Sequence, residues 1–353
     1  RPGAGRVNPP CPYFGRCGGC HWQHLEYAAQ VEAKRRILEE IIRHRFAATR
    51  GLPIAMRTCP RPLGYRSRAR IRIRGSGRRA SVGFFRRGSH AVEDIESCLL
   101  LRPSLNEAMA SLRRLRSRSD ADFKPREMDI ACSEDDGSWA TEPVEPVARE
   151  VAPDTTRAQE REKLPLLRKV GEFQYRTSAS VFFQPNDFMV DELVSLVQES
   201  AQNAGRDCAL DLFAGVGLFS LPLARIFKKI TAVELSPEAC RLGSFNASAA
   251  GFTHVNMVCA DVSDWLRREG PRLSFPIDLV VLDPPRTGAG TAVMEQIQRL
   301  SPQAIIYVSC DPQTLSRDIA AIDPRRYLID LVEGLDLFPQ TFHFETVLRL
   351  VRQ

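Results

Sequence analysis

Short apolar runs alternate with longer amphipathic stretches throughout the C-terminal half of the chain. The apolar runs predict strands, and most of the stretches between them have helical spacing. This rhythm is typical of a parallel α/β sheet with helices on its faces. The predicted strands are Cys208–Phe213, Lys229–Glu234, His254–Ala260, Leu279–Asp283, Ala304–Ser309 and Tyr327–Leu335. A last pair, Asp336–Phe338 and Phe344–Val351, is predicted to add an antiparallel edge.

The N-terminal half has a different pattern. Glu26 to Phe46 has helical spacing, and Ile54 to about Arg102 alternates in the manner of short strands and hairpins. Gly171 to Asn186 again predicts strand, followed by a helix from Asp187 to Ala204. We therefore expect three parts: residues 1–50 with a cysteine motif and a helix, a small β-rich domain at 51–170, and an α/β domain at 171–353.

Composition and charge narrow the class of protein. With 353 residues and 43% hydrophobic content, the chain can form a sizeable core. It has no apolar run of about 18 residues and no leader pattern, so we expect a cytoplasmic protein with no membrane contact. We also expect a monomer. The net charge is only +6, but residues 61–90 contain many arginines and no acid. A strand at Arg68–Arg74 would form a basic stripe, which either contacts nucleic-acid phosphates or is simply solvated. Acids dominate the stretch 132–163, which predicts an exposed loop.

Three of the ten cysteines are close together in the sequence. Cys11, Cys17 and Cys20 have the spacing C-x5-C-x2-C, and a metal site would need a fourth thiol. Zinc usually takes paired C-x2-C motifs, whereas iron–sulfur clusters accept irregular spacing and a distant fourth ligand. The spacing therefore favours a four-iron cluster, while zinc and unmetallated thiols stay open. The candidates for the fourth ligand are Cys59, Cys98 and Cys132, of which we prefer Cys98.

A glycine loop and two acids at strand ends indicate a nucleotide-type cofactor. Asp211–Gly217, with sequence DLFAGVG, closes a predicted strand, but it lacks the third glycine of the dinucleotide motif and the lysine of a P-loop. Glu234, at the end of the next strand, can accept hydrogen bonds from ribose hydroxyls. Asp261, at the end of the third, can accept from an adenine amine or merely cap a helix. Together these features favour S-adenosylmethionine.

Cys310 is the candidate nucleophile, because it follows a predicted strand in the sequence SCDP. At the preceding strand end, Asp283-Pro-Pro is followed by Arg286 where enzymes that methylate exocyclic amines typically carry an aromatic residue. Carbon 5 of a pyrimidine takes a methyl group only after a thiolate adds at carbon 6, and a base must then remove the carbon 5 proton. Glu345, flanked by aromatic residues, is the candidate base, and His343 is the second choice.

As a set, these motifs resemble the RNA uracil-5-methyltransferases, which make 5-methyluridine. The resemblance extends over nearly the whole chain and also includes GYRSRAR at 64–70 and FQPN at 183–186. It implies a Rossmann-like methyltransferase domain, with Cys310 as nucleophile and Glu345 as base. It implies that S-adenosylmethionine contacts Gln184, Phe213, Glu234 and Asp283. Gly215 and Asp261 are the further cofactor contacts that we expect from the glycine loop and the third strand end. It also implies a [4Fe-4S] cluster on Cys11, Cys17, Cys20 and Cys98.

The expected substrate is an unpaired or loop uridine, since stacking in a duplex hides carbon 6 from a thiol. Ribosomal RNA is favoured over transfer RNA. Two alternatives remain at this point. One is a cytosine-5 methyltransferase, although the RNA enzymes of that class typically carry a second cysteine where Arg286 stands. The other is a non-catalytic iron–sulfur protein that binds RNA.

Overall fold

The computed structural model of the chain describes residues 5–46, 49, 51–75, 81–118, 126–133, 136–142, 165–273 and 275–353. Most of the acidic segment predicted as a loop at 132–163 lies outside these residues. Its described part includes a short strand, β6 (Trp139–Glu142).

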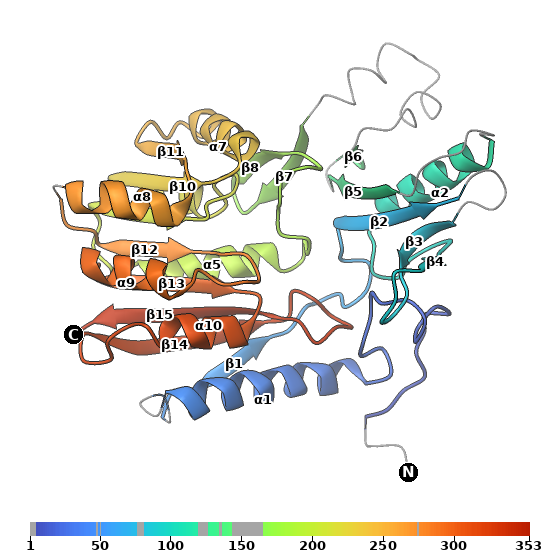
Figure 1. Ribbon diagram of the computed structural model, residues 1–353, viewed down its shortest axis with the longest axis horizontal. Helices are drawn as coiled ribbons and strands as arrows, with labels where there is room; N and C mark the ends of the chain where they lie inside the picture. The colour runs from blue at the N-terminus through green and yellow to red at the C-terminus, as the bar shows by residue number, and fades with distance from the viewer. Residues whose placement is uncertain are drawn as a thin grey trace.

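An eight-stranded sheet forms the larger part of the molecule (Figure 1). Its order is β1-β14-β15-β13-β12-β9-β10-β11, and every neighbouring pair is parallel except the two that involve β15. The predicted strands of the C-terminal half are thereby confirmed, with small changes at their ends. The strands are β1 (Ile54–Arg57), β9 (Cys208–Leu212), β10 (Lys229–Glu234), β11 (Val255–Cys259), β12 (Leu279–Leu282), β13 (Ala304–Ser309), β14 (Tyr327–Leu335) and β15 (Glu345–Arg352).

The predicted antiparallel edge is wrong. The antiparallel strand β15 lies inside the sheet between β13 and β14, and no strand forms at Asp336–Phe338. The burial pattern gives the reason, because Val347 and Leu348 are adjacent in sequence, face opposite sides of the sheet and are both fully buried. A strand covered on both faces belongs in the interior of a sheet. The strand at this edge is β1, which pairs in parallel with β14. In the sequence, β1 comes about 270 residues before β14.

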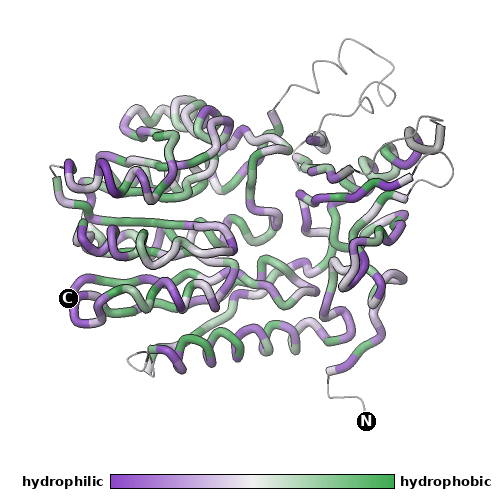
Figure 2. The backbone as a smooth tube through the Cα atoms, in the orientation of Figure 1, coloured by the Kyte–Doolittle hydropathy of each residue, from purple (hydrophilic) through white to green (hydrophobic). Residues whose placement is uncertain are grey.

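Helices cover both faces of this sheet. One layer holds α1 (Tyr27–Arg45), α8 (Val262–Glu269), α9 (Thr291–Leu300) and α10 (Pro312–Ile319). The opposite layer holds α5 (Val190–Ala201), α6 (Ser220–Leu223) and α7 (Pro237–Ala249). Each layer has its own apolar cluster against the sheet. Figure 2 shows the central strands as mainly hydrophobic stretches between helices of mixed character. The result is a three-layer α/β/α arrangement.

A second sheet lies beside the first (Figure 1). It is antiparallel, with the order β4-β3-β2-β5-β6, and α2 (Pro103–Arg118) packs on it. Ala69, Ile71 and Ile73 of β2 point into its core, as the alternation predicts. A separate hairpin of β7 and β8 leads to the large sheet. The remaining strands are β2 (Arg68–Arg74), β3 (Ser81–Phe85), β4 (Val92–Asp94), β5 (Arg126–Cys132), β7 (Leu166–Val170) and β8 (Phe173–Thr177).

The arginines of β2 have acidic neighbours on β5. Arg70 makes a two-pronged ion pair with Asp129, at 2.9 and 3.0 Å, and Arg72 pairs with Glu127 at 3.0 Å. The predicted basic stripe is therefore partly neutralised within the sheet. None of the described helices is long and apolar enough to span a bilayer.

Candidate active site and cysteine cavity

The predicted site residues collect at the carboxyl edge of the large sheet. Register brings the carboxyl ends of four strands close to one level: Leu212 pairs with Val233 and Leu282, and Leu282 pairs with Tyr307. Phe213, Glu234, Asp283 and Cys310 lie at or just beyond these ends. Strand β9 is also where the connections diverge to either side, with β10 on one side and β12 on the other. Ligands of open α/β sheets bind at this kind of switch point.

The glycine loop is held by Glu234. Glu234 Oε2 accepts a hydrogen bond from the Gly215 backbone N–H at 2.9 Å, and Oε1 accepts from Ser236 N–H at 2.8 Å. Both oxygens are thus fixed in position, and each keeps lone-pair capacity for a further donor. Phe213 and Gly215 have φ values of 61° and 56°, so the chain turns sharply where β9 ends. This turn leaves the loop backbone open to a ligand.

Asp261 behaves as a helix cap. Its Oδ1 accepts a hydrogen bond from Asp264 N–H at 3.0 Å at the start of α8, and the side chain is exposed. The structure therefore accounts for this acid without a ligand. A contact between Asp261 and an adenine amine stays a prediction.

Three buried polar groups meet behind the glycine loop. Gln184 Nε2 donates to Asp283 Oδ2 at 3.3 Å, while the buried Gln184 Oε1 has no partner. Asp211 is fully buried on β9 and accepts a hydrogen bond from Ser220 Oγ at 2.6 Å. Burial raises the pKa of Asp211 to about 7, and burial together with Asp211 holds the pKa of Asp283 well above its usual range. The sequence motifs predict no role for the Asp211 carboxyl, although an acid within an otherwise apolar strand is a visible signal.

Cys310 lies in the turn between β13 and α10. Asp311 fixes this turn by accepting hydrogen bonds from Gln313 and Thr314 N–H at 2.9 and 3.1 Å. The half-buried Cys310 thiol is close enough to Glu345, Asp283 and Arg286 for all three to affect its ionisation. Burial and the two carboxyls raise the pKa of this thiol to about 12, against the opposing effect of Arg286. The structure thus brings the predicted nucleophile and base into one site.

Glu345 is the first residue of β15 and is almost completely buried. Its Oε1 has no hydrogen-bond partner. Burial, with a smaller effect of Asp283, raises its pKa well above the ordinary value, while Arg286 lowers it. His343, the second choice as base, is half-buried, and burial together with nearby Arg286 lowers its pKa to about 4. A histidine of that kind is neutral and weakly basic, so Glu345 remains the stronger candidate.

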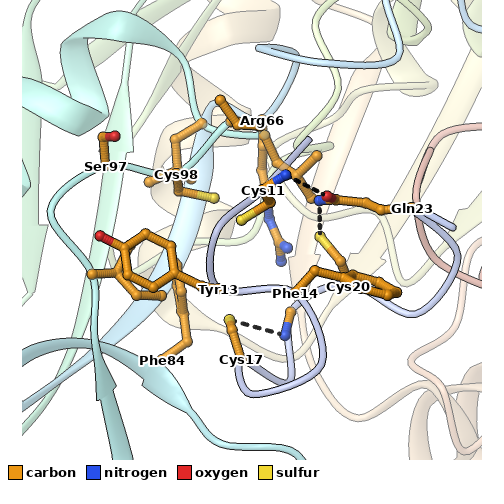
Figure 3. A pocket seen from close by; sticks show the side chains of 15 residues that line it. Cys11, Tyr13, Phe14, Cys17, Cys20, Gln23, Arg66, Phe84, Ser97 and Cys98 are labelled. Atoms are coloured by element: carbon orange, nitrogen blue, oxygen red, sulfur yellow. Dashed lines mark hydrogen bonds between the residues drawn. The ribbon is translucent and has the colours of Figure 1, made fainter. Parts of the chain in front are cut away.

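The four predicted cluster cysteines line one cavity of about 40 Å³ (Figure 3). Cys11, Cys17 and Cys20 come from the N-terminal loop, and Cys98 comes from the turn between β4 and α2. Gln23 Nε2 donates to Cys20 Sγ at 3.2 Å, and Gly19 N–H donates to Cys17 Sγ at 3.4 Å. The thiols point toward a shared space that the Arg66 side chain also enters.

The other two candidates for the fourth ligand lie outside this cavity. Cys59 contacts Asn186 and the Arg61 carbonyl, and Cys132 is buried in the core of the second sheet. Among the residues that the structure describes, no three His, Cys, Asp or Glu side chains converge closely enough for a single metal ion. One zinc ion would draw sulfurs to about 2.3 Å from a common point, whereas a multi-iron cluster holds its thiolates farther apart.

Comparisons with known proteins agree with this geometry. The crystal structure of Pyrococcus abyssi tRNA (uracil-54, C5)-methyltransferase in complex with S-adenosyl-L-homocysteine superposes with a TM-score of 0.71, covering 95% of this chain and 86% of that one at 22% identity. Together with the sheet order and the glycine loop, this defines the class: the fold is that of the S-adenosylmethionine-dependent methyltransferases.

The sequence relatives identify the family, whereas the structural comparison shows only the fold. Residues 156–353 match the family model described as tRNA (Uracil-5-)-methyltransferase. The 23S rRNA (uracil(1939)-C(5))-methyltransferase RlmD of Marinomonas posidonica is 31% identical over 370 residues, covering 99% of this chain and 82% of the relative. An uncharacterized RNA methyltransferase of Thermotoga maritima is 29% identical and covers 98% of this chain and 85% of that protein. The chain belongs to the RNA uracil-5-methyltransferase family. It is thus an enzyme, an RNA (uracil-5-)-methyltransferase, and neither alternative from the sequence is supported.

Proposed function

We propose that this enzyme methylates carbon 5 of an unpaired uridine in RNA, with Cys310 as nucleophile and Glu345 as base. The observation that carries this proposal is the meeting of a thiol and a buried carboxyl with an unpartnered oxygen at the carboxyl edge of the sheet, close to Asp283. The two residues come from different strand ends, β13 and β15, that are paired through Ser309 and Thr346.

The chemistry follows from this arrangement. Cys310 Sγ, as thiolate, forms a bond to carbon 6, and the electron pair of the 5,6 double bond moves toward carbon 5 and the adjacent carbonyl. S-adenosylmethionine supplies the electrophilic methyl group that carbon 5 accepts. Glu345, as carboxylate, then takes the proton from carbon 5, and the electron pair of that bond reforms the double bond and expels the thiolate. Arg286, which lowers the pKa of both Cys310 and Glu345, favours the ionised forms that these steps need.

The edge of the sheet fits the cofactor. Glu234 presents a fixed carboxylate to ribose hydroxyls, and Phe213 and Gly215 line the turn beside it. The unpartnered Gln184 Oε1 can accept a hydrogen bond from the ammonium group of S-adenosylmethionine, and the Asp283 carboxyl can balance the positive charge of its amino-acid part. Asp261 is the predicted contact to adenine.

We infer that the substrate is ribosomal RNA. Support comes from the relatives at 30% and 31% identity that act on 23S rRNA and cover nearly the whole of this chain. Mapping 5-methyluridine in ribosomal and transfer RNA, from cells with and without the protein, tests this. Loss of the modification from transfer RNA alone would overturn the ribosomal assignment.

We also propose a [4Fe-4S] cluster on Cys11, Cys17, Cys20 and Cys98. The cavity that all four cysteines line supports it, as does Arg66 in the same lining, whose positive charge suits an anionic thiolate cluster. Methyl transfer needs no electron transfer, so the cluster's role is structural. It would join the N-terminal loop to the second sheet, because Cys98 lies in the turn between β4 and α2.

Glu345→Gln is expected to separate methyl transfer from product release. The amide keeps the shape of the side chain but accepts no proton, so RNA that already carries the new methyl group should stay bonded to Cys310. Denaturing gels with a labelled methyl group measure this adduct. Rapid release of 5-methyluridine RNA by the variant would exclude Glu345 as the base.

Cofactor binding is expected to strengthen as pH rises. In the free site the raised pKa of Asp283 means that its carboxyl is protonated at low pH, whereas a bound sulfonium favours the carboxylate. Binding near pH 6 should therefore release up to about one proton, and binding well above neutrality should release almost none. Calorimetry in buffers of different ionisation enthalpy measures the release. Asp283→Asn should bind weakly and lose this pH dependence, and an unchanged profile would assign the proton to another group.

A further inference from the structure

The segment between β14 and β15 is fastened to the N-terminal part of the chain. Gln30 of α1 and Gln340 form two reciprocal hydrogen bonds: Gln30 Nε2 donates to Gln340 Oε1, and Gln340 N–H donates to Gln30 Oε1, both at 3.0 Å. The Gln340 carbonyl accepts from the backbone N–H groups of His21 and Trp22 at 2.9 and 3.0 Å. The backbone N–H, the backbone carbonyl and the side-chain Oε1 of Gln340 are thus used by residues about 300 positions away.

Two further contacts hold the same segment. Lys34 Nζ donates to Asp336 Oδ1 at 2.6 Å and to the Phe338 carbonyl at 3.1 Å, and both charged side chains are completely buried. Tyr65 Oη donates to the Pro339 carbonyl at 3.1 Å. Residues 336–340 therefore contact α1, the loop after Cys20 and the approach to the second sheet at once.

The backbone of Gln340 shows that this attachment determines the path of the chain. Its φ is +69°, in the left-handed region that residues other than glycine rarely adopt. A conformation of this kind persists where the surroundings hold it in place. The hydrogen bonds from Gln30, His21 and Trp22 are those surroundings.

Glu345 depends on this segment for its position. It is the first residue of β15, and its pairing with Leu335 is the last step of the β14–β15 ladder. The ladders to β14 and β13 hold the strand that begins at Glu345, and the loop from 336 to 344 sets the path by which the chain enters it. A shift of Gln340 would therefore be transmitted to the carboxyl that faces Cys310.

We propose that Gln30 and Gln340 are positioning residues that set the Glu345 carboxyl for proton removal. The proposal rests on the proposed role of Glu345 as base. Because His21 and Trp22 directly follow Cys20, the same contacts connect the cysteine cavity with the active site. The N-terminal loop that carries the cavity cysteines therefore also helps to hold Glu345 in position, through Gln340.

The test separates the two chemical steps. Gln30→Ala removes both reciprocal bonds and also the bonds that Gln30 Nε2 donates to the Trp22 and Leu25 carbonyls. Gln340→Asn tolerates the left-handed backbone and keeps the backbone N–H bond to Gln30, but its shorter side chain loses the bond from Gln30 Nε2. Glu40→Ala, on the exposed side of the same helix, is the matched control. Single-turnover reactions with labelled methyl donor measure methyl incorporation into RNA and, separately, the methylated adduct that survives denaturation.

Both variants are expected to incorporate the first methyl group within about twofold of wild type. Release of methylated RNA should slow by about 10- to 100-fold, because a small misplacement of a catalytic group has effects of this size. The adduct should accumulate as in Glu345→Gln, and Glu40→Ala should behave as wild type. Melting temperature and cofactor affinity, measured on each protein, confirm that the variants are folded.

Two results would overturn the proposal. Equal loss of incorporation and release would mean that the contact supports the fold as a whole, and unchanged kinetics in both variants would mean that the ladder alone places Glu345. A failure of the proposed function can be distinguished from these two results, because wild-type protein would then form no adduct with 5-fluorouridine RNA.

Discussion

Replacing Cys310 with alanine is expected to abolish methyl transfer and to leave cofactor binding intact. Without the thiol, carbon 5 of uracil has too little electron density to take the methyl group. Loss of a covalent nucleophile costs on the order of 10⁴-fold or more in turnover. Methyl incorporation into RNA and calorimetric affinity for S-adenosylmethionine are the two measurements.

A mechanism-based substrate makes the test sharper. RNA with 5-fluorouridine at the target cannot lose its carbon 5 substituent as a proton, so wild-type protein should remain bonded to it. Cys310→Ala should form no such adduct. Cys208→Ala, which removes a thiol from the opposite end of β9, is the matched control and should form the adduct normally. Methyl transfer by wild type without any adduct on the fluorinated RNA would disprove the Cys310 mechanism.

Local patterns were sufficient for most of the large sheet. Strands such as Ala304–Ser309 are buried on both faces, so an uninterrupted run of apolar residues marks where each strand begins and ends. Order within the sheet was harder to predict. The strand β1 has only four residues and resembles the hairpin strands that follow it, so nothing local shows that it pairs with β14. The interior place of β15 likewise depends on partners that no local window contains.

The same division holds for the site. Strand ends predict that Phe213, Glu234, Asp283 and Cys310 share one edge, because parallel strands bring their carboxyl ends together. Side-chain partners from distant segments leave no such signal. In the sequence, Lys34 looks like an ordinary charged residue of an amphipathic helix. In the structure its side chain is completely buried against Asp336. A buried ion pair is tolerated only where its geometry is good and further hydrogen bonds satisfy both groups. That arrangement arises only when the distant segments fold together.

Replacing Cys98 with alanine is expected to remove the iron from the protein. Cys98 is the only one of the four cavity cysteines that does not come from the N-terminal loop, so its loss leaves three ligands on one short segment. Anaerobically purified wild type should be brown and hold about four irons per chain, as a four-iron cluster with four thiolates requires. The Cys98→Ala variant should fall below about one iron and melt at a lower temperature, since metal binding contributes to folding.

Cys59→Ala and Cys132→Ala are the matched controls, because both remove buried thiols that lie outside the cavity. Each should keep its iron and its colour. Iron lost from Cys59→Ala or Cys132→Ala, but retained in Cys98→Ala, would move the fourth ligand to that residue. Stoichiometric zinc in a colourless wild-type protein would replace the cluster with a single-ion site, for which the four thiols would have to close in on a common point.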